Sequence, residues 1–185
     1  MTAETLALIA GRRSTKRFSD DPPARSLIES LLQAAVSAPD HGLLAPWRFL
    51  VLQGDARALL GDAMAAALRT RMPEADEEAL ARERGKAFRS PVLIVVSVRP
   101  VAHPKVPEIE QWVATGAAVQ NLWLAAVSSG LGLAWKTGSA AYDPGVKRAL
   151  GLAEEDGVVG FLHVGTPLVQ SSPRPVEATS RTRWL

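Results

Sequence analysis

The 185-residue sequence contains no cysteine. This absence excludes disulfide bonds, a catalytic thiolate and an iron–sulfur cluster. Histidine is scarce as well, because only His41, His103 and His163 occur, and no two of them have the H-x-x-x-H spacing of a zinc site. Zinc sites in proteins are built mostly from cysteine and histidine, so we expect no zinc centre.

Common catalytic and nucleotide-binding motifs are also missing. The sequence has no G-x-S-x-G nucleophile motif, no Walker phosphate-binding loop and no G-x-G-x-x-G dinucleotide fingerprint. Gly130 and Gly132 have part of that fingerprint, but they follow a helical pattern and the third glycine is absent. The sequence therefore does not support hydrolase or ATP-dependent chemistry.

Neither net charge nor hydropathy indicates a DNA or membrane partner. The formal net charge is +2, although the sequence pI is about 9.3, and so small a charge does not favour DNA or an anionic membrane. The longest unbroken apolar run within residues 112–135 is residues 122–127, far short of the roughly 20 residues of a membrane helix. The first residues lack the basic and apolar regions of a signal peptide, so we expect a cytoplasmic protein.

Length and composition suit one domain that spans residues 1–185. Apolar residues make up 47% of the chain and charged residues 22%, as in ordinary globular proteins. Helical and strand-like patterns alternate irregularly, which predicts an α+β fold with a mixed sheet enclosed by helices. We expect helices at residues 25–38, 55–71, 108–130 and 144–150, and strands at residues 48–52, 92–98, 133–138 and 158–165.

Three of these stretches carry information about burial. Residues 92–98 are apolar on both faces, which predicts a strand at the centre of a covered sheet. Residues 73–89 mix acidic and basic side chains, as an exposed helix does. The helix at residues 108–130 is apolar nearly all round, and in so short a chain a second subunit is the expected cover. The sequence therefore predicts a homodimer.

Positive charge is concentrated between a short amphipathic helix, which ends at Gly11, and a proline-rich turn. The segment contains four cations and two hydroxyls: Arg12, Arg13, Lys16, Arg17, Ser14 and Thr15. Arginine forks suit a phosphate, and hydroxyls add neutral donors, so the segment is a candidate anion site. A solvated basic loop and a nucleic-acid patch are the alternatives for such a segment considered by itself.

Two further stretches carry polar side chains suited to binding. They are the Pro-Asp-His-Gly loop at residues 39–42 and the Trp-Lys-Thr-Gly turn at residues 135–138. Neither supplies an activated nucleophile. This combination is typical of an enzyme in which a bound cofactor carries the reaction and the protein positions it.

Five motifs, taken in order, resemble the flavin-dependent nitroreductase family. They are Arg-Arg-Ser-Thr-Lys-Arg-Phe at 12–18, Ser-Ala-Pro at 37–39 leading to Pro-Trp-Arg-Phe at 46–49, Ser-Pro and an apolar strand at 90–96, Gly-Leu-Gly-Leu-Ala-Trp at 130–135, and Gly-Phe-Leu-His-Val-Gly-Thr-Pro at 160–167. The resemblance runs from end to end, and the Ala-Pro-Asp-His form of residues 38–41 is most similar to the small YdjA-type nitroreductases.

The resemblance implies a nitroreductase-like α+β fold, with a central mixed or antiparallel sheet enclosed by helices in an intertwined homodimer. It also implies FMN at the subunit interface and NAD(P)H as electron donor. The expected reaction is reduction of a small acceptor, such as a nitroaromatic or a quinone, by a ping-pong mechanism. The flavin carries the chemistry, so no side chain is expected to be catalytic.

Carried onto this sequence, the resemblance places Arg12, Arg13 and Ser14 at the FMN phosphate and ribityl chain. It places Lys16 at the pyrimidine edge of the flavin ring. Paired arginines suit a phosphate that carries a charge of about −1.5 to −2. A cation at the pyrimidine edge would stabilise the negative charge of the reduced flavin.

The same resemblance assigns Ser37 and His41 to contacts with the flavin of the other subunit. Trp135, Lys136 and Thr137 would lie beside the ring near its reactive nitrogen, where a backbone N–H would donate a hydrogen bond. Considered alone, His41 also fits a turn or cap, and Trp135 also fits a core anchor. His163 lies within an apolar strand pattern, which predicts a satisfied core or edge residue.

This chain departs from the family at two loop positions. Leu43 and Ala45 stand where many members have Asn and Gln. Near the carboxyl terminus, Arg181 and Arg183 are candidates for a further phosphate contact. Two other functions compete with the enzyme: a flavin- or tetrapyrrole-binding storage or sensor module without turnover, and a basic nucleic-acid binder, which the low net charge disfavours.

Overall fold

The computed structural model describes residues 3–169, 172 and 177–185. The α-helices are α1 (Ala3–Gly11), α2 (Arg25–Ala35), α3 (Arg57–Arg71), α4 (Glu77–Gly85), α5 (Glu108–Ser128) and α6 (Pro144–Ala149). The strands are β1 (Trp47–Gln53), β2 (Val92–Val98), β3 (Gly132–Lys136) and β4 (Gly157–Gly165). The short 3-10 helices are η1 (His41–Leu43), η2 (Gly54–Ala56), η3 (Lys86–Phe88), η4 (Ser139–Tyr142) and η5 (Thr179–Arg181).

The four strands form one sheet in the order β1-β2-β4-β3. Each neighbouring pair of strands is antiparallel. The predicted α+β fold is confirmed, and of the two expected sheet types, mixed or antiparallel, the sheet is antiparallel. β3 lies at the edge of this order, and the basic segment extends the sheet beyond it. Ser14 forms a parallel bridge with Leu133, and Phe18 forms an antiparallel bridge with Pro167.

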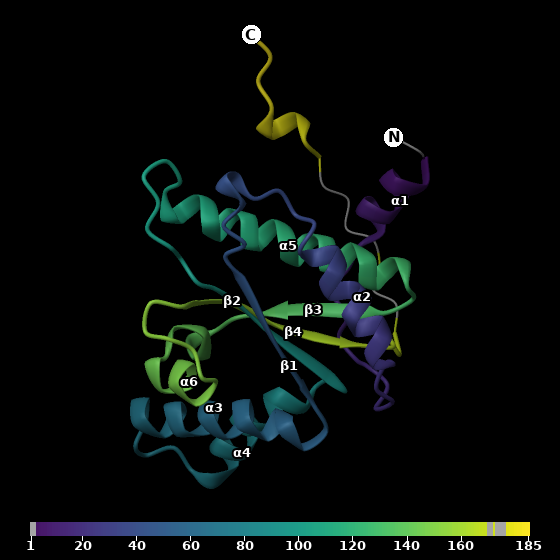
Figure 1. The fold of residues 1–185 in the computed structure, drawn as a ribbon. Helices are drawn as coiled ribbons and strands as arrows, with labels where there is room; N and C mark the ends of the chain where they lie inside the picture. The colour runs from purple at the N-terminus through teal and green to yellow at the C-terminus, as the bar shows by residue number, and fades with distance from the viewer. Residues whose placement is uncertain (1–2, 170–171, 173–176) are drawn as a thin grey trace.

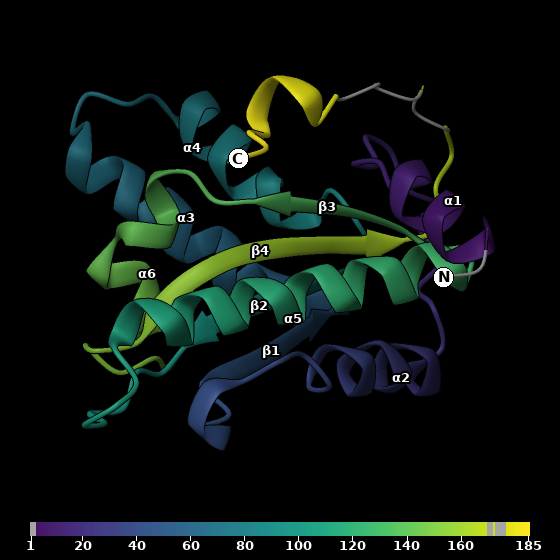
Figure 2. The same cartoon turned by 90° about the horizontal axis from the view of Figure 1, so that it is seen from above.

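β2 is the buried centre of the fold, as its apolar pattern predicts, because all seven of its residues are buried. Ile94 and Val96 face one apolar core, and Leu93 and Val95 face the other. Figures 1 and 2 show the corresponding layers, with α2 and α5 on one face of the sheet and α3, α4 and α6 on the opposite face. The sheet is therefore enclosed by helices.

α5 is buried where it faces the sheet and exposed on its outer side. Val119 and Leu122 are fully buried, whereas Ile109 and Val113 each expose 66% of their surface. The outer apolar face is thus available to the second subunit that the sequence predicts, and that subunit stays a prediction. No helix formed by the described residues has the length and apolar character needed to cross a membrane.

The charged stretch at residues 73–89 forms α4 and η3. Its acidic and basic side chains lie mostly at the surface, as predicted, but Leu80 and Ala87 are buried. Asp76 caps α4 by accepting a hydrogen bond from the backbone N–H of Ala79 at 2.7 Å. The stretch therefore packs against the rest of the domain, and β2 is the element that follows η3.

The carboxyl-terminal residues 177–185 lie beyond the layer formed by α2 and α5, on the side away from the sheet (Figure 1). Trp184 exposes 91% of its surface in the subunit, so its expected docking on a partner stays a prediction. Pro173, Arg174 and Pro175 of the same tail lie outside the described residues.

Candidate functional site

The basic segment lies against the outer edge of β3. The backbone N–H of Thr15 donates to the carbonyl of Leu133 at 2.9 Å, and the Ser14–Leu133 bridge continues the contact. Gly132 makes this approach possible, because a Cβ atom at that position would overlap the Thr15 side chain. A glycine in β3 thus sets how closely the cations can approach the sheet.

Arg12 and Arg13 are held in different ways. The Arg12 guanidinium lies 4.2 Å from the ring centroid of Trp123 on α5. Arg13 Nη1 donates to the carbonyls of Ala10 at 2.7 Å and Arg12 at 2.6 Å, and its Nε donates to the carbonyl of Ser172 at 3.2 Å. Within the described part of the chain neither guanidinium has a carboxylate partner, so their positive charge is available to an external anion.

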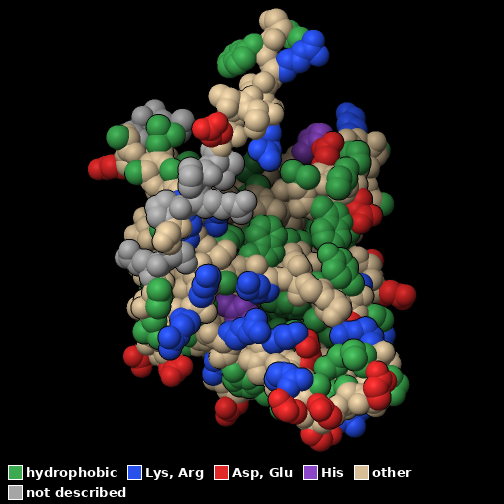
Figure 3. Space-filling model, turned by 180° about the vertical axis from the view of Figure 1, so that it is seen from behind, with side chains coloured by type: hydrophobic (Ala, Val, Ile, Leu, Met, Phe, Trp, Pro, Cys, Tyr) green, Lys and Arg blue, Asp and Glu red, His purple; other side chains and the backbone are tan. Residues whose placement is uncertain are grey.

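Two adjoining cavities lie on the face of the sheet covered by α3. The Lys16 cavity, of about 270 Å³, is lined by Ser14, Thr15, Lys16, Phe18, Arg89, Ala134, Lys136 and His163. The Phe161 cavity, of about 230 Å³, shares Arg89, Lys136 and His163 with it and extends to Thr137 and Phe161. Figure 3 shows Lys and Arg side chains gathered around a hollow on this side of the molecule. Three of the predicted site residues, Ser14, Lys16 and Lys136, therefore line one cavity.

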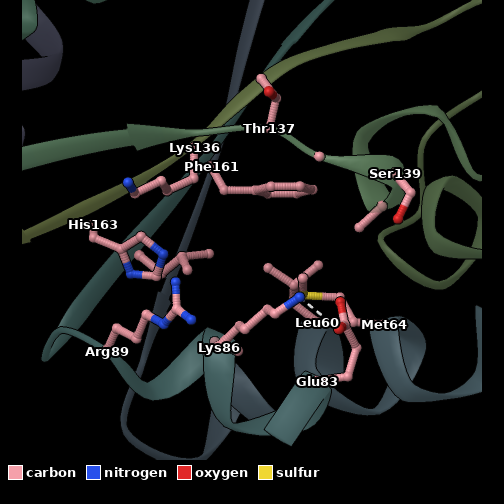
Figure 4. A pocket seen from close by; sticks show the side chains of 14 residues that line it. Leu60, Met64, Glu83, Lys86, Arg89, Lys136, Thr137, Ser139, Phe161 and His163 are labelled. Atoms are coloured by element: carbon pink, nitrogen blue, oxygen red, sulfur yellow. Dashed lines mark hydrogen bonds and ion pairs between the residues drawn. The ribbon is translucent and has the colours of Figure 1, made fainter. Parts of the chain in front are cut away.

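The Phe161 cavity combines apolar walls with a cationic rim. Leu60, Met64 and Phe161 provide apolar surface, while Lys86, Arg89 and Lys136 bring positive charge (Figure 4). Glu83 is the acidic residue of this lining, and its carboxylate is bonded to Lys86 Nζ at 2.5 Å. The remaining cations suit a planar ligand whose rim accepts hydrogen bonds.

His163 is buried between the two cavities, with 4% of its surface exposed. Burial, together with the charges of Arg89 and Lys136, lowers the pKa of His163 from 6.5 to about 4. The imidazole is therefore neutral at pH 7. Its Nδ1 lies 3.0 Å from Ser90 Oγ, so the prediction of a core histidine with a hydrogen-bond partner is confirmed for this nitrogen.

Trp135 and Lys136 point to opposite faces of the sheet, as consecutive strand residues do. Lys136 pairs with Phe161 on the cavity side, whereas Trp135 pairs with Leu162 and packs against the core under α5. The indole N–H of Trp135 donates to the carbonyl of Val159 at 3.0 Å. In the subunit Trp135 is thus a core anchor, and a place for its side chain beside a flavin stays a prediction.

Ser37 and His41 lie away from these cavities, in the connection between α2 and β1. Ser37 Oγ donates to the carbonyl of Ala34 at 2.7 Å. His41 Nδ1 lies 2.5 Å from Glu110 Oε2, which ties the loop to the first turn of α5. Contacts of both residues with a flavin in the other subunit remain predictions.

Arg13 does not line the Lys16 cavity. It lines a third cavity, of about 300 Å³, together with Gly130 and Gly132 near the end of α5. The two cavities share Thr15. Arg181 and Arg183 are both exposed, and their expected phosphate contact likewise stays a prediction.

The loop between η1 and β1 is strained at the two positions where this chain departs from the family. Leu43 has a φ of 54° and Ala45 a φ of 45°, in the left-handed region that disfavours most side chains. Asp40 Oδ2 accepts a hydrogen bond from the backbone N–H of Ala45 at 2.6 Å, which supports this conformation. Leu43 nevertheless exposes 90% of its surface.

Sequence reasoning missed Arg89 and the cavity role of His163. Arg89 ends a stretch of mixed charges, and His163 sits in an apolar strand pattern, so neither had a local signal of binding. The antiparallel register places His163 opposite Ala134 on one side and Leu93 on the other. A polar side chain within an apolar strand was the one signal that pointed to His163.

Comparisons with known proteins agree with this architecture. A family model described as the Nitroreductase family matches residues 9–166. The chain is 35% identical over 173 residues to an Escherichia coli (strain K12) protein named "Putative NAD(P)H nitroreductase YdjA", with 91% of each chain covered. It is also 30% identical over 191 residues to 5,6-dimethylbenzimidazole synthase of Rhodospirillum rubrum, covering 96% of this chain and 87% of that one.

Solved structures show the same fold. A nitroreductase-like family protein from Bacillus cereus superposes with a TM-score of 0.86 at 28% identity, covering 100% of this chain and 97% of that chain. A Desulfovibrio desulfuricans protein in complex with FMN superposes with a TM-score of 0.79 at 24% identity, covering 98% and 96% of the two chains.

Proposed function

This chain belongs to the nitroreductase family, and from that premise we propose that it is an FMN-dependent oxidoreductase. It takes hydride from NAD(P)H and reduces a small acceptor, such as a nitroaromatic or a quinone, by a ping-pong mechanism. The observation that carries the proposal is the cation-lined Lys16 cavity, which brings Ser14, Lys16 and Lys136 together beside β3.

The side chains of this region fit FMN by their chemistry. Arg12 and Arg13 lie outside the Lys16 cavity, but they have no carboxylate partner among the described residues. With Ser14, which lines the cavity, they would neutralise a phosphate at its end. Lys16 and Lys136 offer donors to carbonyl oxygens at the edge of the ring, and Ala134 leaves room between them. FMN, when bound, supplies the hydride and electron transfer.

The protein contributes binding, charge and shelter from water. Positive charge from Lys16 and Lys136 would favour a flavin that becomes more negative on reduction. The apolar wall formed by Leu60, Met64 and Phe161 would exclude water from the ring. β3 ends at Lys136 and Thr137 follows it, both at the cavity, so the backbone of this turn would lie next to the reacting part of the ring.

A homodimer is part of the proposal. The exposed apolar side chains Ile109 and Val113 on α5 would pack against the second subunit, which would bring its own Ser37 and His41 to the flavin. This arrangement would give Ser37 and His41 a binding role although neither lines the two cavities of its own subunit.

The visible spectrum of the purified protein tests the function. We expect a yellow dimer that NADPH or NADH bleaches without oxygen and that a nitroaromatic or quinone then recolours. Tight flavin binding without bleaching would favour the storage or sensor module. A colourless protein that cannot be reconstituted with FMN would refute the proposal.

A charge-matched pair of variants tests the location of the flavin. Lys16→Gln removes one cation from the cavity, and we expect an affinity for FMN that is weaker by at least roughly tenfold, since a charged hydrogen bond contributes about 1.5–3 kcal/mol. Lys105→Gln removes one exposed cation from the loop before α5 and should leave the affinity unchanged. Equal affinities for the two variants would place the flavin elsewhere.

A further inference from the structure

His163 has one ring nitrogen that the subunit leaves available. Nδ1 is bonded to Ser90 Oγ at 3.0 Å, but no hydrogen bond joins Nε2 to any described residue. Figure 4 shows the imidazole directed into the cavity, with Lys136 on one side and Arg89 on the other. The available nitrogen therefore faces the space in which we place the flavin.

The hydrogen bonds of Ser90 determine which nitrogen of His163 carries the proton. Ser90 Oγ lies 2.7 Å from the carbonyl oxygen of Val92, which can only accept, so the single hydroxyl proton of Ser90 is donated there. Ser90 Oγ must then accept from His163 Nδ1–H. Since the imidazole is neutral at pH 7, Nε2 carries a lone pair and is an acceptor.

Ser90 is itself held in place. Arg57 Nη1 donates to the Ser90 carbonyl at 2.6 Å, and the Arg57 guanidinium lies 4.9 Å from the Phe88 ring centroid. Ser90 exposes only 3% of its surface. The orientation of His163 is thus set by a chain of contacts that reaches back to the start of α3.

The surroundings of Nε2 consist of donors. Arg89 and Lys136 line the same cavities as His163, and neither side chain has a hydrogen bond or a carboxylate partner within the described residues. Lys16 is a third cation near His163, because both residues line the same cavity. A neutral acceptor among cationic donors is complementary to a ligand edge in which one N–H stands between two carbonyl oxygens.

We propose that His163 Nε2 accepts the imide N–H at the pyrimidine edge of FMN, while the neighbouring cations donate to the two carbonyl oxygens that flank it. This inference rests on the proposed function and assigns His163 as a specificity-determining residue within it. The three-point pattern selects a flavin with a free imide over an analogue whose imide nitrogen is blocked.

Paired ligands test the assignment without any activity measurement. The dissociation constants of FMN and N3-methyl-FMN are measured by quenching of flavin fluorescence on the wild-type protein. We expect FMN to bind at least about tenfold more tightly, the factor that corresponds to roughly 1.4 kcal/mol for one hydrogen bond.

Variants at His163 separate the hydrogen bond from the shape of the cavity. His163→Leu should weaken FMN and leave N3-methyl-FMN unchanged, so that the ratio of the two constants approaches one. His163→Gln supplies an amide oxygen and should restore part of the preference. An unchanged ratio in His163→Leu would overturn the inference. A wild-type protein that binds neither flavin would overturn the proposed function, and this inference with it.

The ¹⁵N spectrum of histidine-labelled wild-type protein tests the tautomer directly, and it does not depend on the folding of a variant. We expect a protonated Nδ1 and an unprotonated Nε2 at pH 7, with the Nε2 resonance moving upfield when FMN is added. A protonated Nε2, or an Nε2 resonance that FMN leaves unchanged, would overturn the assignment.

Discussion

Gly132→Ala should disturb both the stability of the domain and its affinity for FMN. The added Cβ would overlap Thr15 Oγ1 and would lie 2.9 Å from both Cβ and Cγ2 of Thr15. Thr15 cannot easily move away, because its backbone N–H is bonded to Leu133 at 2.9 Å and its β-branched side chain has few rotamers. The basic segment must therefore shift outward from β3.

The size of the effect follows from the clash. Overpacking in a well-packed site costs about 1–3 kcal/mol. For a domain of this length each kcal/mol lowers Tm by roughly 2–4 °C, so we expect a decrease of about 4–8 °C for the middle of that range. Because Ser14 and Lys16 flank Thr15, the same shift should weaken FMN binding. Thermal unfolding at one fixed protein concentration and flavin fluorescence quenching measure the two effects.

Two controls make the result interpretable. Gly85→Ala adds a Cβ at the end of α4, where it meets no atom within 4 Å apart from its chain neighbours and the backbone of its own helix, and it should leave FMN affinity unchanged. Thr15→Ala in the Gly132→Ala background removes Oγ1 and Cγ2, so it should restore part of the lost stability. A Gly132→Ala protein with wild-type Tm and wild-type FMN affinity would show that the contact between the segment and β3 does not have the assigned role.

Three other predictions concern stability. The bidentate hydrogen bond from Arg99, at 2.8 and 2.7 Å, lowers the pKa of the buried Asp156 carboxyl. The ionised carboxylate therefore stabilises the fold at pH values above the ordinary aspartate pKa of about 3.9, and this stability is lost as the pH falls through the lowered pKa. Tm measured during an acid titration should show this loss in the wild-type protein and not in Asp156→Asn. The pKa of His163 is lowered to about 4 in the folded protein, so between pH about 6.5 and 4 the unfolded chain binds a proton that the folded chain does not. The free energy of unfolding should therefore decrease by roughly 3 kcal/mol as the pH is lowered over that range. Urea unfolding of His163→Gln should lack this part of the decrease. Leu43→Asn places a residue that tolerates the left-handed region at a φ of 54° and should stabilise the subunit by about 0.5–1 kcal/mol; a lower Tm would indicate that Leu43 makes an apolar contact with the second subunit.

The elements of this fold could be predicted where their pattern is local and strong. The apolar run of β2 and the long helix α5 depend only on residues within each stretch, and both appear close to the predicted bounds. Helix ends were less predictable: α2 stops at Ala35 although the apolar pattern continues to residue 38. The antiparallel arrangement required the pairing of distant strands.

The candidate site was only partly predictable for the same reason. Ser14 and Lys16 were found because their cations and hydroxyls are adjacent in the chain. Arg89 was assigned to a solvated charged face, since nothing near it in the sequence shows that η3 turns it toward β4. The opposite directions of Trp135 and Lys136 follow from strand geometry, but which face holds the cavity depends on the helices that cover each side.

The sequence by itself determined the chemistry that this protein lacks, the concentration of cations at residues 12–17 and the order of motifs that marks its family. Those properties are read from residue types and short spacings. Only the tertiary structure decided which cations share a cavity and which nitrogen of His163 faces it. The contact that fixes that nitrogen joins Ser90 to His163 across 73 residues of chain. Strand order and register bring such residues together, and neither is encoded in any single stretch.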